Sequence, residues 1–185
     1  MMQTKINFIA LAAAISSLLL VAISVFVPWW VLSISSPVNA QVNFSPVNFN
    51  LSHSGAAIAI PLISALTVAC LLTLLAGGIM LAIYSVKPTE SYSRRLLGFG
   101  YKKPLYTLVA FVVILFATSI LLHAFMGITL PINGSEQIAP RGASASASVS
   151  GVLNWPFYFA IAVTGLCIVG RAVHGKVAQP PTISQ

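Results

Sequence analysis

Four long apolar stretches, separated by polar segments, dominate the pattern of this chain of 185 residues. They cover residues 6–27, 56–84, 105–130 and 155–173, and among them only Arg171 carries a charge. A helix needs about 20 apolar residues to cross a hydrocarbon core of roughly 30 Å. The pattern therefore predicts four transmembrane helices, and the second, which is longer than the core requires, is expected to tilt or to kink near Pro61.

The first polar segment, residues 28–55, predicts strands. Apolar and polar residues alternate from Val42 to Ser52, as in a half-buried strand, and Trp30 to Ser35 forms a further short candidate. The sequence Ser-Pro-Val-Asn occurs at 36–39 and again at 45–48, and its prolines favour turns or edges. We predict a small antiparallel sheet of two or three strands that caps the helices.

The second polar segment, residues 131–154, contains an Ala-Ser tract that suits either another thin strand or a flexible tether. The expected fold class is therefore an all-α integral membrane protein, a four-helix bundle with a small β cap from the first outer loop. The whole chain is expected to form one membrane domain.

Composition supports lipid as the natural solvent, because 58% of the residues are hydrophobic and 6% are charged, whereas soluble domains average about 25% charged. Basic residues cluster in residues 85–104, which contain Lys87, Arg94, Arg95, Lys102 and Lys103. By the positive-inside rule this loop, the N-terminus and the tail 174–185 are cytoplasmic, and the other two loops are outside the cell membrane. Nucleic-acid binding is not expected.

The same basic residues suggest a first partner. Arg94, Arg95, Lys102 and Lys103 suit contacts with anionic lipid headgroups, although topology alone explains them equally well. The N-terminal region also resembles a secretory signal with a small-residue cleavage site at 38–40. Its apolar run exceeds the usual h-region of about 7–15 residues, so we expect the first span to be retained.

Aromatic residues mark the ends of the predicted spans, where amphipathic rings prefer the headgroup zone. These residues are Trp29, Trp30, Tyr84, Tyr106, Trp155 and Tyr158. Both cysteines, Cys70 and Cys167, fall inside apolar runs, which favours free, buried thiols over a disulfide.

Catalysis by side chains is not expected. The spans contain no carboxylate, and the chain lacks a phosphate-binding glycine loop, a zinc-protease motif and a nucleophile elbow. Two histidines are the exceptions. His123 and Met126 share one face of the third span, and His53 precedes the second span on the same side, a set that suits haem b. The alternative is that His123 is a hydrogen-bonded interior residue and His53 a loop residue.

Three glycosylation sequons begin at Asn43, Asn50 and Asn133, all in the loops expected outside. The scarcity of acidic residues, two in the chain, predicts a surface exposed to acid, as on an acid-loving archaeon. Carboxylates lose their charge near pH 4, whereas Ser, Asn and Gln keep their hydrogen bonds at any pH.

Small residues recur at four-residue steps in the second span and predict close helix packing. They include Ala65, Ala69, Thr73 and Gly77. Both packing within the chain and packing against another subunit fit this stripe.

The predicted layout resembles that of claudins and related tetraspan proteins. It has four spans, both ends inside, and a long first outer loop that begins at Trp29-Trp30. The resemblance covers topology, and the first loop lacks the paired cysteines of that family. The leading functional hypothesis is a non-catalytic structural or accessory subunit of a larger membrane or cell-surface complex, with other integral membrane subunits as partners. The alternatives are a haem- or quinone-associated subunit of a respiratory complex and a small transporter of neutral solutes.

The predicted orientation is tested by single cysteines introduced as Gln41→Cys and Phe99→Cys, each labelled in intact cells with a membrane-impermeant thiol reagent. Position 41 is expected to react and position 99 to stay protected, because the basic loop is retained inside. The reverse labelling pattern would invert the topology.

Overall fold

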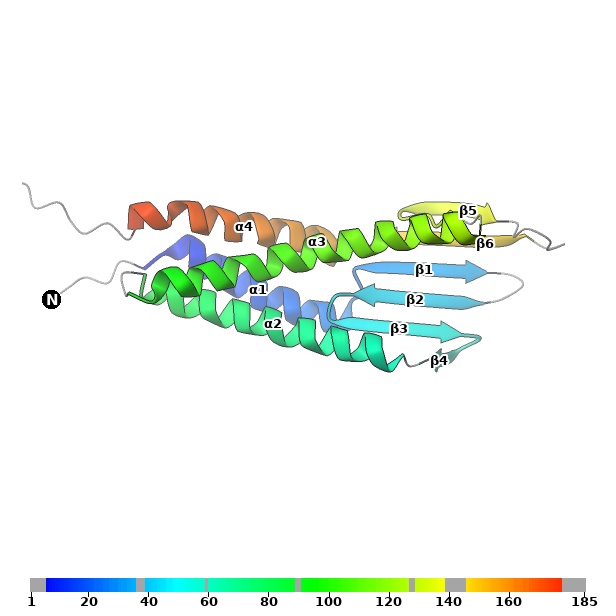
Figure 1. Cartoon of the computed structure of the whole chain (residues 1–185), viewed down its shortest axis with the longest axis horizontal. Helices are drawn as coiled ribbons and strands as arrows, with labels where there is room; N and C mark the ends of the chain where they lie inside the picture. The colour runs from blue at the N-terminus through cyan, green and yellow to red at the C-terminus, as the bar shows by residue number, and fades with distance from the viewer. Residues whose placement is uncertain are drawn as a thin grey trace, which may run out of the picture.

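The computed structural model describes residues 6–35, 39–58, 60–88, 91–126, 129–138 and 146–177. Four helices pack as an elongated bundle at one end, and six strands form one antiparallel sheet at the other (Figure 1). The helices are α1 (Phe8–Phe26), α2 (Pro61–Val86), α3 (Ser93–Met126) and α4 (Trp155–Val177). The strands are β1 (Trp30–Ser35), β2 (Ala40–Ser45), β3 (Asn48–His53), β4 (Ala56–Ile58), β5 (Gly134–Ile138) and β6 (Ala147–Leu153).

The sheet corrects the expected fold class. The protein is mixed α/β, with strand order β4-β3-β2-β1-β6-β5, and the prediction of an all-α bundle with a cap of two or three strands is wrong. Both polar segments contribute strands, because β6 from the second pairs with β1 from the first over Trp30–Ser35. The Ala-Ser tract is therefore a strand from Ala147 onward, and its residues 141–145 lie outside the described residues.

The period of two along the strands gives the sheet an apolar and a polar face. Leu32, Val42 and Leu51 lie in register across β1, β2 and β3 on the face toward the helices. The next row, Ser33, Gln41 and Ser52, lies on the opposite face. One face therefore joins the core and the other presents neutral hydrogen-bonding groups.

The turn between β2 and β3 fixes the sheet to the end of α1. The last carbonyl groups of a helix have no partner inside that helix. The Ser45 hydroxyl donates to the Ser24 carbonyl oxygen at 3.0 Å, and the Asn48 side-chain amide donates to the Val25 carbonyl oxygen at 2.8 Å. Ser45 and Asn48 belong to the second Ser-Pro-Val-Asn sequence, which is thus the cap of a helix as well as a turn.

Two helices, α2 and α3, begin at residues that differ from the prediction. Pro61 lies at the first position of α2, where its missing N–H costs nothing, so residues 56–58 are free to pair as β4. α3 begins at Ser93 and continues through Pro104, so the second half of the basic segment 85–104 is helical.

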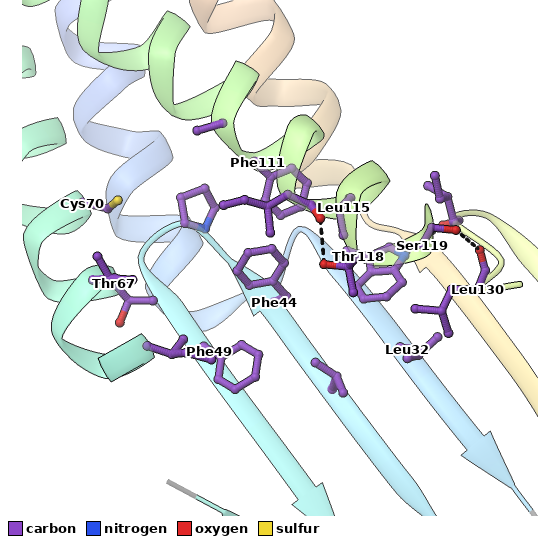
Figure 2. A pocket seen from close by; sticks show the side chains of 18 of the residues that line it. Leu32, Phe44, Phe49, Thr67, Cys70, Phe111, Leu115, Thr118, Ser119 and Leu130 are labelled. Carbon is purple, nitrogen blue, oxygen red and sulfur yellow. Dashed lines mark hydrogen bonds between the residues drawn. The ribbon is translucent and has the colours of Figure 1, made fainter. Parts of the chain in front are cut away.

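Close approach of α2 and α3 occurs away from the sheet, at two glycines. A Cβ added at Gly100 would lie 2.5 Å from Leu81 Cγ and 3.0 Å from the Gly77 carbonyl oxygen, so only glycine fits there. Toward the sheet the two helices diverge and side chains from the strands lie between them (Figure 2).

Gly100→Ala is expected to lower the stability of the bundle by about 1–3 kcal/mol, the usual cost of overpacking. Gly98→Ala is the matched control in α3, because no atom lies within 4 Å of the added Cβ, and removing a helical glycine is expected to stabilise by up to about 1 kcal/mol. Thermal unfolding in detergent measures both. Equal melting temperatures for the two variants would contradict the close α2–α3 contact.

Candidate functional site: an apolar cavity between helices and sheet

A cavity of about 520 Å³ lies where α2 and α3 diverge above the sheet (Figure 2). Its walls come from α2, from α3 and from the helix-facing side of β1, β2 and β3. The volume is in the range of small-molecule sites, roughly 300–1,000 Å³. Its size and its position between the helices and the sheet make this cavity a candidate site.

Aromatic rings form the floor of the cavity. Phe44 on β2 stacks on Phe111 of α3 with ring centroids 5.1 Å apart, and Phe49 meets Phe44 edge-on at 6.0 Å. Such pairs add about 0.5–1.5 kcal/mol beyond the burial of their area. The floor is therefore fixed by the same contacts that join the sheet to α3.

Of the four hydroxyl side chains in the lining, three donate to backbone carbonyl oxygens: those of Thr67, Thr118 and Ser119, the last to Leu130 at 3.4 Å. Thr67 donates to the Ser64 carbonyl oxygen at 2.9 Å, and Thr118 donates to the Ile114 carbonyl oxygen at 2.8 Å. Such bonds to the preceding turn are typical of hydroxyl side chains in apolar helices. No Lys, Arg, Asp or Glu lines the cavity, so its interior presents carbon surface.

The mouth of the cavity lies between α2 and α3. Among its lining residues, Leu66 of α2 is 58% exposed and Ile114 of α3 is 50% exposed, whereas Leu115 and Phe111 are buried. The cavity therefore opens sideways, between two helices whose outer surfaces are apolar.

The histidines predicted as haem ligands lie elsewhere. His53 ends β3 and His123 lies in the last turn of α3, and both are exposed. The Met126 side chain lies outside the described residues. Among the described residues no three His, Cys, Asp or Glu side chains gather as a metal site. Haem b binding stays a prediction without structural support.

The sequons lie on or beside the sheet. Asn43 on β2 and Asn50 on β3 are direct partners in the antiparallel register, on the polar face, and Asn133 is exposed just before β5. Asn43 is half-buried and accepts from the Gln41 side-chain amide at 3.0 Å, whereas Asn50 is exposed. Glycosylation and exposure to acid both stay predictions.

The predicted packing stripe is divided. Gly77 is buried against α3, whereas Ala65, Ala69 and Thr73 are exposed toward the sheet end of α2. Within the described chain these three contribute little to helix packing, so a small, smooth surface remains on the outside of α2. Both cysteines are free thiols; Cys167 is buried as predicted, whereas Cys70 is only half-buried.

Basic residues gather at the end of the bundle that is far from the sheet. Arg94 and Arg95 lie in the first turn of α3 and are exposed, as is Lys102 farther along. The Lys103 ammonium lies 4.3 Å from the centroid of the Phe99 ring, a cation–π contact that holds this side chain against its own helix.

A buried polar cluster at the same end was not predicted. Asn7 caps α1 by accepting from the Ala10 N–H at 3.1 Å, and its side-chain amide donates to the Tyr84 hydroxyl at 3.1 Å. The Tyr84 hydroxyl is also hydrogen-bonded to His174 Nδ1 at 2.8 Å. The cluster joins α1, α2 and α4. An Asn immediately before an apolar run is a helix-cap signal, but no local pattern indicates that it meets Tyr84 and His174.

Tyr84→Phe is expected to destabilise the bundle by about 1–3 kcal/mol, because the buried Asn7 amide and His174 both lose their partner. Tyr106→Phe removes the hydroxyl of a tyrosine that is 58% exposed and is expected to change stability by less than about 0.5 kcal/mol. Unfolding in detergent, followed by circular dichroism, compares the two. An unchanged midpoint for Tyr84→Phe would show that the cluster does not hold the helices together.

No protein-family model and no curated protein sequence matches the chain. The resemblance to claudins therefore stays a likeness of layout. Function has to be argued from the surfaces and the cavity of the chain itself.

Proposed function

We propose that the protein is a multi-pass membrane protein that acts as a non-catalytic structural or accessory subunit of a larger membrane assembly. Its four helices are long and apolar enough to cross a bilayer, and most of the large side chains that they expose are apolar. Charged residues gather at the end of the bundle far from the sheet, which by the positive-inside rule supports a sheet outside the cell.

The observation that carries the proposal is the excess length of α3. α1 has 19 residues and is thus about 28 Å long, close to the thickness of a hydrocarbon core. α3 has 34 residues; it starts near the same end as α1 and continues alongside the sheet (Figure 1). We call the hydrocarbon layer that α1 would span the slab. The last turns of α3 therefore extend past this slab.

These last turns of α3 remain strongly apolar and exposed. Ile120 is 66% exposed, Leu121 55% and Phe125 84%. Phe125 lies eleven residues after Ile114 at the cavity mouth, which places both on one side of the helix. Contiguous apolar surface of this kind marks an interaction site in proteins.

A partner subunit is the cover that fits this surface. A transmembrane neighbour would pack on the small residues Ala65, Ala69 and Thr73 of α2, as helices do in lipid. The part of that neighbour outside the bilayer would cover Leu121 and Phe125. The polar face of the sheet stays available to the medium.

The test is co-purification in mild detergent with identification of bound chains by mass spectrometry. Phe125→Ala is expected to release the partner, whereas Phe8→Ala is expected to retain it, because Phe8 is also exposed (72%) but lies at the opposite end of the bundle. A wild-type chain that purifies alone as a monomer would contradict the proposal. Equal retention by both variants would place the contact elsewhere.

A further inference from the structure

We infer that the cavity between α2, α3 and the sheet binds one hydrocarbon chain of a membrane lipid. The inference rests on the membrane placement proposed above, and is independent of the partner. It follows from the shape of the cavity, its chemistry and its access.

The cavity is long and narrow. Its lining residues on α3 run from Thr107 to Leu122, a distance of about 22 Å at the helical rise of 1.5 Å per residue. A volume of about 520 Å³ spread over that length leaves a cross-section that suits a single extended chain rather than a ring system or a folded peptide.

Carbon surface lines the cavity almost throughout. The hydroxyls of Thr67 and Thr118 are bonded to their own helices. The Trp30 indole N–H donates to the Ile132 carbonyl oxygen at 2.9 Å. The Ser119 hydroxyl donates to the Leu130 carbonyl oxygen at 3.4 Å. A buried water needs two to four polar partners. Because Thr107 is the one remaining hydroxyl of the lining, hydrocarbon is the complementary content.

The position of the cavity gives lipid direct access. Trp29, three residues after the end of α1, contacts Phe111 with ring centroids 5.0 Å apart. This contact places Phe111 at the level where α1 ends, and Thr107 one turn deeper in the proposed slab. Ala110, which lines the cavity and is exposed, lies within the slab at this deep end, so a chain from the adjoining leaflet can enter there and extend toward the mouth between Leu66 and Ile114.

Trp30 lines the cavity and is only 6% exposed, which provides a reporter. The purified chain is reconstituted in phosphatidylcholine vesicles whose acyl chains are brominated, because bromine quenches tryptophan on contact. The chain has three tryptophans. Trp155, which is 55% exposed, is expected to be quenched by the surrounding bilayer and thus reports insertion. The emission of Trp30 is isolated in a Trp155→Phe background, as the difference between that variant and the same variant with Trp30→Phe added. This Trp30 emission is expected to be quenched as well, although the side chain is buried.

A filling variant and a control complete the experiment. Ala110 lines the cavity and is exposed, so Ala110→Phe is expected to exclude the chain and restore the Trp30 emission. Ala162→Phe, at an exposed alanine of α4 that neither lines the cavity nor belongs to the partner surface, is expected to leave the quenching unchanged.

The outcomes separate the two proposals. Unquenched Trp30 emission beside quenched Trp155 overturns the lipid site and leaves membrane insertion standing. Quenching that Ala110→Phe does not relieve also overturns the site. Absence of quenching at both tryptophans overturns the membrane placement and the lipid site together.

Discussion

The contacts of Trp29 fix the position of the helices relative to the sheet. The Trp29 ring is 1% exposed and packs edge-on against Phe111 of α3. Its backbone N–H donates to the Phe44 carbonyl oxygen at 3.0 Å, and its carbonyl oxygen accepts from the Asn154 N–H at 2.8 Å. The indole N–H donates to the Ser24 hydroxyl at 2.7 Å. One residue thus connects the end of α1, the second strand, the start of α4 and the middle of α3, with each of its polar groups satisfied as burial demands.

The neutral composition of the first polar segment follows from what it must satisfy. Ser45 and Asn48 donate to the last carbonyls of α1, and Ser45 is completely buried. A charged donor there would have to lose its hydration, which costs several kcal/mol unless a counter-charge is present. Hydroxyl and amide groups supply the same hydrogen bonds without that cost. The strands around this turn are likewise free of charge, and the row through Ser33, Gln41 and Ser52 continues the neutral polarity across the sheet.

Length and hydropathy were sufficient to predict the four helices, and strict alternation from Val42 predicted β2 and β3. The sequence did not decide between a strand and a flexible tether for β6, because alternating Ala and Ser differ little in hydrophobicity. The strand is determined by its pairing with β1, which is distant in the sequence. β4 was hidden in the apolar run before Pro61, since a short apolar segment does not distinguish helix from strand. Tyr84 and Trp29 were assigned to the headgroup zone as span-end aromatics, yet both are buried. The cavity has no local signal at all, because helices and strands distant in sequence form it.

The two ends of the α2–α3 pair explain why the cavity exists. Near Gly77 and Gly100 the two helices approach so closely that a Cβ at Gly100 would lie 3.0 Å from the Gly77 carbonyl oxygen. At the other end the side chains of Phe44 and Phe49 project from the sheet into the space between α2 and α3. A pair of helices fixed closely at one end and wedged apart at the other leaves an open, elongated space along its length. The exposed apolar turns of α3 begin at the mouth of that space, so any subunit seated on them also controls access to the cavity. The proposed lipid chain and the proposed partner would therefore meet at one place, where the sheet holds α2 and α3 apart.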